Sequence, residues 1–550
     1  MRIHLVHRLI SASAIVVIGL TSCRPPIPAS LSTTTPPATP VPVTPTPAAT
    51  LTPTLQLPTS TPDTRPRVES PAWFKDAVIY EIFPRSFYDA DGNGIGDLAG
   101  ITQKLDYVQS LGANTLWLTP HYPSNTYHGY AVADYLTVNS DFGTLDDFKK
   151  LVAELHQRGM HLIVDFVANH SSNEHPYFKD AFGNPASQYA DWFHFTNDAH
   201  TEYKSFYGVR ELPEWNHDNP AVNEYLINAG LFWLGLGADG LRCDYALGVE
   251  SAFWTQLRTA VKAKHPDAVL LGEVWDPAPA KLRKYFNAGF DALFDFPWYL
   301  SLSTAADAVG KGVLNGTSLA SELQGPYKLM QLYYPNGAQL VRFASNHDTN
   351  RIASAALGDM GKMRLAAALA LLTPGTPMIY YGEEIGMRGI KGTGPAYDEY
   401  VREPMDWAAN DAGTGVTTWF RPTDRFNKPN DGISVEEEDK PADSLLNFYR
   451  QLSQLRAAHP ALRSESFEVM EAVKGCANCL GMWRWSSGVN GDGELIALVF
   501  NMGGDAATVD LSDQPIALVS LANAQSLLEP GSAPTFTIQP HGVLALRWPA

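Results

Sequence analysis

Eight short apolar segments recur along the chain from Trp73 onward, and longer stretches with helical apolar spacing separate them. This alternation is typical of parallel strands joined by helices, because a parallel connection needs a crossover of about a dozen residues or more. Eight such strands predict a closed (β/α)8 TIM barrel. The predicted strands are 78–83, 115–118, 161–167, 240–244, 269–273, 292–296, 340–345 and 378–381.

The rest of the chain from residue 71 divides around this predicted barrel, which we expect to span 71–460. Apolar spacing predicts helices such as 145–158 and 221–236. The stretch 171–218 is too long for a simple βα loop, so we expect an inserted subdomain after the third strand. Short alternating segments then predict a C-terminal all-β sandwich domain over 461–550, and they are 479–485, 494–500, 506–511 and 543–548.

The first 70 residues have a different character. Basic residues precede an apolar run over 9–20, which is typical of an export signal and too short to span a bilayer comfortably. The run ends in Leu-Thr-Ser-Cys23, which resembles a bacterial lipobox. We therefore expect a lipoprotein signal peptide over 1–23 and a lipid anchor at Cys23 on the extracellular face of a bacterial membrane. The alternative is an ordinary signal peptide with an incidental cysteine. Residues 24–70, rich in Pro and Thr, predict a disordered tether.

The charge balance limits the possible ligands. The chain has 58 acidic and 40 basic residues, for a formal net charge of -18. Phosphate backbones are bound by clustered Lys and Arg, which the sequence lacks, so we expect no nucleic-acid partner. Aromatic residues make up 11% of the chain, and their flat rings suit sugar faces, although most aromatic residues in any protein belong to the core. With this net charge, a neutral or cationic ligand therefore fits better than nucleic acid.

Polar side chains follow several of the predicted strands, at the edge where TIM barrels carry their chemistry. An acidic residue at one strand end is often only a helix cap, but four strands repeat the pattern here. Glycoside hydrolysis with retention needs two carboxyl groups about 5–5.5 Å apart. Neighbouring strands lie about 4.8 Å apart, so Asp244 and Glu273 on the fourth and fifth strands suit that separation.

Four segments carry these residues, namely 165–170, 240–244, 272–275 and 343–348. Together with 212–216 they resemble the signature regions of the α-amylase family of glycoside hydrolases, in order and spacing as well as in residues, and the resemblance covers roughly 73–550. It implies Asp244 as the nucleophile, Glu273 as the general acid/base, and Asp348 as the carboxylate that holds sugar hydroxyls. It also implies substrate contacts, made by Tyr130, His170, Arg242, Trp275 and His347.

The residues themselves support these roles. Arg242 lies two positions before Asp244 on one strand, so both side chains face one side, and the guanidinium would keep the nucleophile ionised and oriented. Glu273 must be protonated at rest, and apolar neighbours such as Val274 and Trp275 would raise its pKa. The histidines at 170 and 347 each follow an Asn at a strand end, where capping or packing is the alternative role.

Two departures from the family pattern bear on specificity. Members that trim terminal glucose often carry an Asp three residues before the Tyr130 position, where Tyr127 stands here, which favours an open cleft and internal cutting. Many α-amylases carry Lys and His three and four residues beyond the nucleophile, where this chain has Leu247 and Gly248. The leaving-side subsites are therefore undetermined, and Trp275 is a candidate to line them.

The expected activity is cleavage of internal α-1,4 bonds in starch-like glucans and maltooligosaccharides. Neopullulanase, α-glucosidase or transglycosylase activity of the same family is the alternative. A non-catalytic carbohydrate-binding ectodomain is a different class of function, but such a protein would be expected to lack one of the catalytic carboxylates. All three are present.

An acidic, glycine-rich segment follows the first predicted strand. Oxygen-bearing side chains recur at alternate positions, and the twelfth position is Gly100 rather than the Glu of an EF-hand. The segment resembles a first-loop calcium site of the family, which implies a structural calcium ion held by Asp89, Asp91, Asn93, Asp97 and the Ile95 carbonyl. A turn without metal is the alternative. Cys476 and Cys479 are candidates for a small disulfide, with a redox or zinc role as the alternative.

Overall fold

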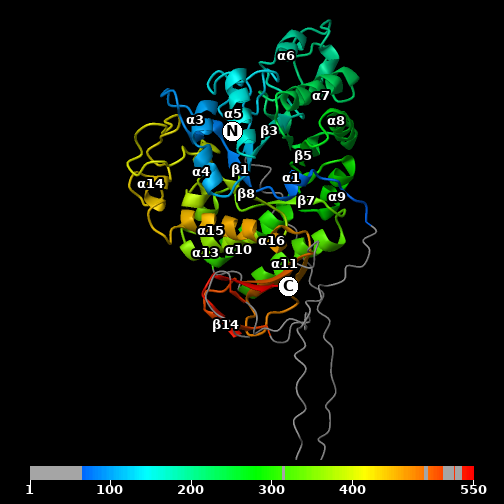
Figure 1. The fold of residues 1–550 in the computed structure, drawn as a ribbon. Coiled ribbons are helices and arrows are strands. Elements are labelled where there is room, and N and C mark those ends of the chain that lie inside the picture. The colour runs from blue at the N-terminus through cyan, green and yellow to red at the C-terminus, as the bar shows by residue number, and fades with distance from the viewer. Residues whose placement is uncertain are drawn as a thin grey trace, which may run out of the picture. The chain divides into compact units, whose positions relative to one another are not determined.

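The computed structural model describes residues 65–311, 316–394, 396–487, 493–511, 525–526 and 535–549, with only the backbone described at 304–311, 316–319, 525–526 and 548–549. Its centre is a closed barrel of eight parallel strands in chain order (Figure 1). The prediction of a TIM barrel is confirmed. The strands are β1 Ile79–Ile82, β2 Thr115–Leu118, β3 His161–Val167, β4 Gly240–Asp244, β5 Val269–Gly272, β6 Ala292–Phe294, β7 Gln339–Phe343 and β8 Thr376–Tyr380.

The helices between the strands begin where capping residues allow. The helix α5 starts after Thr144, whose side chain accepts a hydrogen bond from the Asp147 amide. The Asp147 carboxylate in turn accepts from the Thr144 amide, and the two bonds form a capping box. Its apolar stripe faces the barrel. The helices are α1 Ala72–Lys75, α2 Pro84–Phe87, α3 Leu98–Gln103, α4 Leu105–Ser110, α5 Leu145–Gln157, α6 Pro176–Ala181, α7 Pro220–Gly235, α8 Ser251–Lys264, α9 Pro279–Ala288, α10 Phe296–Lys311, α11 Gly316–Leu332, α12 Ile352–Ala355, α13 Met360–Leu372, α14 Val435–Glu438, α15 Leu445–Ala458 and α16 Pro460–Arg463.

Side chains of each strand alternate between the helix layer and the barrel interior. On β4, Leu241 and Cys243 join the large core beneath the helices. Arg242 and Asp244 therefore face the interior. A separate apolar cluster, which includes Ile79, Trp117 and Phe343, fills that interior below them. The alternation thus delivers Asp244 to the carboxyl end of a packed barrel rather than to a pore.

The segment between β3 and α7, where an inserted subdomain is expected, contains α6 and two short 3-10 helices, η2 Ala190–Trp192 and η3 Phe206–Gly208. Isolated bridges such as Phe193 with Trp215 tie it together. Aromatic rings supply much of its interior, with the Phe193 and Trp215 rings stacked at 4.6 Å between centroids. In Figure 1 this segment lies around α6, beyond the ends of the barrel strands.

The C-terminal part forms a five-stranded sheet in the order β13-β15-β11-β10-β9 and a two-stranded sheet of β12 and β14. One face of the large sheet, with Leu480 and Phe500, joins the core of the barrel's helix layer. The other face, with Val499, packs with Val509 of β12. This confirms the sandwich. The strands are β9 Phe467–Val469, β10 Cys479–Ser486, β11 Glu494–Asn501, β12 Ala507–Asp510, β13 Gln525–Ser526, β14 Thr535–Ile538 and β15 Val543–Pro549.

A disulfide joins Cys476, in the turn before β10, to Cys479, the first residue of β10, and Cys243 is a buried free thiol. Within the described ranges, no helix has both the length and the apolar character needed to cross a membrane. The expected signal peptide and Cys23 lie outside the described residues, as does the expected tether up to residue 64. Residues 65–70, expected in the tether, already contact the fold, since the Val68 amide donates to the Asn336 carbonyl at 2.8 Å.

Candidate active site

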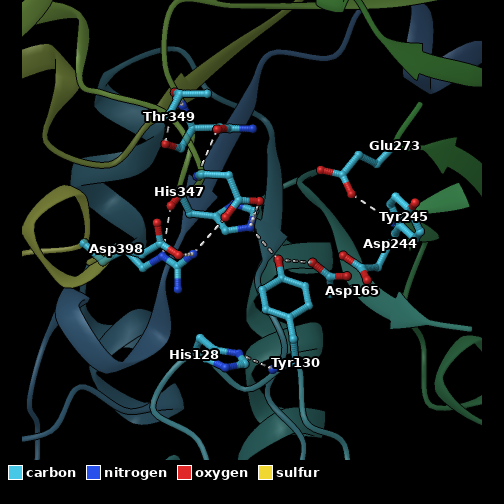
Figure 2. A network of polar contacts seen from close by, with 12 residues as sticks. His128, Tyr130, Asp165, Asp244, Tyr245, Glu273, His347, Thr349 and Asp398 are labelled. Carbon is cyan, nitrogen blue, oxygen red and sulfur yellow. Dashed lines mark hydrogen bonds and ion pairs between the residues drawn. The ribbon is translucent and has the colours of Figure 1, made fainter. Parts of the chain in front are cut away.

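Three predicted carboxylates follow strands of the barrel at its carboxyl end. Asp244 is the last residue of β4, and Glu273 directly follows β5. The two positions lie side by side, because the Glu273 amide continues the parallel ladder by donating to the Cys243 carbonyl at 3.0 Å. Asp348 lies in the loop after β7, next to His347, which Figure 2 shows across the site from Asp244 and Glu273. The structure therefore gathers the three residues that the sequence singled out.

The guanidinium of Arg242 connects the carboxylates of β3, β4 and β5. Its Nη1 atom lies 2.7 Å from Asp244 Oδ1 and 2.9 Å from Asp165 Oδ1. Its Nη2 atom lies 2.8 Å from Glu273 Oε1. The sequence predicted only the contact with Asp244. The fork reaches further because one planar group presents two NH2 ends to neighbouring strand ends. Asp244 and Glu273 are thus held within reach of one group.

The proton balance of this pair follows from burial and mutual repulsion. Burial raises the pKa of Asp244 to about 7, against the opposing effect of Arg242 and with a further rise from Asp165. Burial likewise raises the pKa of Glu273 to about 7, again against Arg242 and with help from Asp244. Ionisation of either carboxylate disfavours ionisation of the other. Near neutral pH the pair therefore holds about one proton, as an acid beside a nucleophile requires.

His347 and Asp348 form a second charged group. The His347 Nδ1 atom lies 2.5 Å from Glu81 Oε1, and its Nε2 atom lies 3.1 Å from Asp348 Oδ2. Burial alone would lower the pKa of His347, but these two carboxylates raise it to about 9. Arg402 Nη2 contacts Asp348 Oδ1 at 2.8 Å. The two cations keep the pKa of Asp348 well below its usual range despite burial, so it is ionised.

The remaining predicted contact residues lie around these charges. The Tyr130 ring stacks on His347 with 5.5 Å between centroids, and its hydroxyl lies 3.2 Å from Asp165 Oδ2. His170 is neutral, because burial lowers its pKa to about 3, and its Nε2 atom has no hydrogen-bond partner among the described residues. The free Nε2 atom of His170 can therefore hydrogen-bond to a sugar hydroxyl. Trp275 is 42% exposed and stacks on Phe296.

Sequence reasoning missed three residues of the site. Asp165 lies within the segment 165–170, where no local pattern indicates its role, and it shares Arg242 with the pair. Glu81 is a single acidic residue in an apolar strand, a pattern that only weakly indicates a functional residue, and its carboxylate contacts His347 Nδ1. Arg402 lies in a region rich in Gly, Pro, Asp and Asn that offers no periodic pattern. Its Nε atom donates to the His347 carbonyl at 2.9 Å.

The acidic segment after β1 folds into a tight loop. Ligand atoms of Asp89, Asp91 and Asp97 all lie within 4.8 Å of one another. Burial raises the pKa of Asp97, with Asp91 adding to the rise while backbone amides oppose it. The Asn93 side chain is turned toward Asp91 and donates to it at 3.1 Å. Three converging carboxylates that repel one another fit a hard cation with oxygen ligands.

Comparison with known proteins agrees with this geometry. A family model described as "Alpha amylase, catalytic domain" matches residues 81–465. "Alpha-amylase 3" of Dictyoglomus thermophilum is 35% identical over 416 residues, covering 72% of this chain and 80% of that protein. "Neopullulanase 2" of Thermoactinomyces vulgaris is 34% identical, covering 64% and 62%. The crystal structure of an α-amylase from H. orenii superposes with a TM-score of 0.73 at 32% identity, covering 86% and 99%.

Proposed function

The chain belongs to the α-amylase family of glycoside hydrolases, whose members retain the anomeric configuration, and from this premise we propose that it cleaves internal α-1,4-glucosidic bonds of starch-like glucans and maltooligosaccharides. One observation carries the catalytic assignment. A single buried guanidinium contacts both Asp244 and Glu273, so the two carboxylates face one glycosidic bond from neighbouring strands.

The proposed chemistry has two steps. In the first, an Asp244 oxygen attacks the anomeric carbon while Glu273 gives its proton to the leaving glycosidic oxygen, so a glycosyl ester forms and the bond to the leaving sugar breaks. In the second, Glu273 takes a proton from water, whose oxygen replaces Asp244 at the anomeric carbon. Asp348, kept ionised by His347 and Arg402, binds hydroxyls of the same sugar and favours its distorted, oxocarbenium-like form.

The endo mode rests on the surroundings of Tyr127. This residue occupies the position where exo-acting members often carry Asp, and its hydroxyl accepts from Arg402 Nη1 at 3.2 Å. A neutral phenol there offers no carboxylate to grip a chain end. Neopullulanase, α-glucosidase or transglycosylase action is the second candidate, supported by the similarity to a protein named neopullulanase.

Product analysis distinguishes these activities. We expect maltooligosaccharides of several lengths as the first products from starch, in the α configuration. Glucose as the sole first product from maltooligosaccharides would contradict the endo proposal. We also expect Asp244→Ala to abolish hydrolysis of starch and of short substrates alike. An unchanged rate in that variant would overturn the assignment of the nucleophile, whereas a wild type that binds glucans without hydrolysing them would favour the carbohydrate-binding ectodomain.

For the acidic loop we propose a structural calcium ion, held by Asp89, Asp91 and Asp97 with Asn93 and the Ile95 carbonyl. The convergence of the three carboxylates supports it. The ion would neutralise their repulsion and fix the chain between β1 and α3. It would have no part in the chemistry, which uses carboxylates alone.

For the location of the protein we propose a lipid anchor at Cys23 on the extracellular face of a bacterial membrane. The basic start, the apolar run and the cysteine at its end support it. Expression of the full chain in a bacterium, followed by detergent phase separation, tests the anchor. The wild type is expected in the detergent phase and Cys23→Ser in the aqueous phase; an aqueous wild type would contradict it.

A further inference from the structure

His347 lies between two carboxylates that occupy both of its ring nitrogens. Its Nδ1 atom lies 2.5 Å from Glu81 Oε1, and its Nε2 atom lies 3.1 Å from Asp348 Oδ2. A neutral imidazole has one N–H group and one lone pair, so one of its nitrogens would present a lone pair to a carboxylate oxygen. Only the doubly protonated ring donates to both carboxylates. The contacts themselves therefore favour an imidazolium ion at this position.

Glu81 is placed where a carboxylate is costly. It is the third residue of β1, between Tyr80 and Ile82, and its side chain is fully buried. Its Oε2 atom has no hydrogen-bond partner among the described residues. Burial of a negative charge is unfavourable unless an opposite charge compensates it. His347 is the compensating group, because Glu81 Oε1 accepts from its backbone amide at 3.3 Å as well as from its ring.

The other side of the His347 ring connects to groups that surround the substrate. Its Nε2 atom lies 2.6 Å from the Tyr130 hydroxyl, which donates to Asp165 Oδ2 at 3.2 Å (Figure 2). Asp348, the second acceptor at Nε2, also contacts Arg402 Nη2 at 2.8 Å. A proton on Nε2 thus orients both the Tyr130 hydroxyl and the Asp348 carboxylate. Whether that proton is present together with the proton on Nδ1 depends on the charge of Glu81.

We propose that Glu81 is a positioning residue that keeps His347 doubly protonated and, through this cation, keeps Asp348 ionised and oriented toward the substrate. The inference rests on the proposed function, because it takes Asp348 as the carboxylate that binds sugar hydroxyls. Glu81 acts through His347 rather than on the substrate, since its side chain is fully buried within the barrel strand β1.

Replacement of Glu81 by glutamine isolates the charge from the shape. The amide has the same size as the carboxylate and can still hydrogen-bond to Nδ1, but it carries no charge. Burial opposes the charge of His347, and Asp348 and Glu81 together raise its pKa to about 9. Without the charge of Glu81, the pKa of His347 must fall toward the neutral range. The ring of the variant should then lose a proton within the range in which the wild-type ring stays charged.

The other charged and titratable groups around His347 are the same in this variant. They come from four further elements, and they are Tyr130 after β2, Asp165 on β3, Arg242 on β4 behind these two, and Arg402 after β8. Asp348 in the loop after β7 is also unchanged. A difference between the two proteins in the titration of His347 therefore reports the charge of Glu81.

The pH dependence of starch hydrolysis tests the proposal. The kcat of Glu81→Gln should approach that of the wild type at low pH, where His347 is charged in both proteins, and should fall behind as the pH rises. We expect the ratio of wild-type kcat to variant kcat to increase roughly tenfold from the acid to the alkaline side of neutrality. KM should change less, because Asp348 binds the distorted sugar more strongly than the relaxed one. Glu81→Asp keeps the charge, so its ratio should increase less.

Glu384→Gln is the matched control. Glu384 is a fully buried glutamate that accepts from the hydroxyls of Tyr80 and Tyr107 at 2.7 and 2.6 Å, outside the active site. Its ratio of wild-type kcat to variant kcat should not depend on pH. A ratio that is likewise independent of pH in Glu81→Gln would show that Glu81 only supports the structure, and it would overturn the proposal.

The protonation of His347 can also be measured without any activity. In NMR spectra of the full chain with isotopically labelled histidine, the His347 ring signals are those missing from His347→Gln. At neutral pH both ring nitrogens should carry protons in the wild type, and the proton dissociation constant of the ring should be roughly tenfold higher or more in Glu81→Gln. A neutral ring in the wild type, or the same constant in both proteins, would overturn the proposal. A wild type with the expected titration that hydrolyses no glucan would instead refute the proposed function, which keeps the two failures distinguishable.

Discussion

Arg242 serves two residues with opposite needs, since the nucleophile must be ionised and the acid protonated. Its Nη1 end faces Asp244 and Asp165, and its Nη2 end faces Glu273. A cation this close would normally lower the pKa of every carboxylate it touches. Burial outweighs that effect for Asp244 and Glu273, and the repulsion between the two then allows only one of them to ionise readily. The guanidinium thus orients both groups without removing the proton that the acid must donate.

The pH dependence of this pair is open to a direct test. Activity requires an ionised Asp244, so it should fall as the pH drops below about 7, where the pair titrates. Activity also requires a protonated Glu273, so it should fall again as the pH rises above that value.

Glu273→Gln should slow starch hydrolysis by roughly 10²- to 10⁴-fold. With α-maltosyl fluoride, whose leaving group needs no proton, the variant should keep glycosyl-enzyme formation and lose the alkaline limb. The measurement is kcat/KM against pH for both substrates, and an alkaline limb that survives in the variant would assign it to another group.

Among the connecting elements, the loop between β1 and α3 depends most on a ligand. Without a cation its carboxylates repel one another. Chelation by EDTA should therefore lower Tm by roughly 5–10 °C, and added calcium should restore it in a concentration-dependent way. Asp91→Ala should have the low Tm from the start and respond little to calcium, whereas the exposed Asp505→Ala should behave as the wild type does. A Tm that ignores EDTA in the wild type would argue for a turn without metal.

Local patterns sufficed for β2, β3 and β4, whose bounds the sequence predicts to the residue. The strands β2 and β3 are mostly apolar runs, and β4 alternates the apolar Leu241 and Cys243 with the polar Arg242 and Asp244. The strand β7 starts one residue earlier than expected, at Gln339, a buried polar side chain whose Nε2 atom donates to Glu465 across 126 positions. No local pattern reveals such a partner. The same holds for Arg402, which reaches Asp348 only because a long connection after β8 folds back over the site. The bounds of β2, β3 and β4 are encoded locally, whereas partners from distant segments are not.

For the whole molecule, the C-terminal sheet is bound to the barrel's helices by polar as well as apolar contacts. Arg484 of β10 is buried and donates to the Leu372 carbonyl at 2.7 Å, the Leu462 carbonyl at 3.1 Å and the Ser464 carbonyl at 2.6 Å. Burial and the nearby Arg456 lower the pKa of Arg484 to about 9. Burial of the positive charge is thus unfavourable, and the hydrogen bonds to the three carbonyls offset part of this penalty. Leu372 ends α13, Leu462 lies within α16, and Ser464 directly follows α16.

Removal of that guanidinium should therefore destabilise the whole unit. Arg484→Ala removes the guanidinium that donates to the Leu372 and Ser464 carbonyls, whereas the Leu462 carbonyl still accepts from Arg456 Nη1. We expect the free energy of unfolding to fall by about 2–4 kcal/mol. Urea denaturation followed by circular dichroism measures the change, with Arg210→Ala as a control because that side chain is exposed and pairs with Glu202 at the surface. A loss confined to fluorescence of the C-terminal sheet, with the barrel unaffected, would show that the two parts unfold independently.

The shared packing of the sheet and the barrel also determines where this gene tolerates recombination. Side chains of β10, β11 and β15 belong to the same continuous cluster as the helix layer, although the family match ends at residue 465. A recombination crossover at residue 465 would divide this continuous hydrophobic core, and the apolar side chains of each half would no longer pack against their native partners. Chimaeras built from this enzyme should keep everything from Trp73 to the last strand together and exchange only the segments that protrude around the substrate.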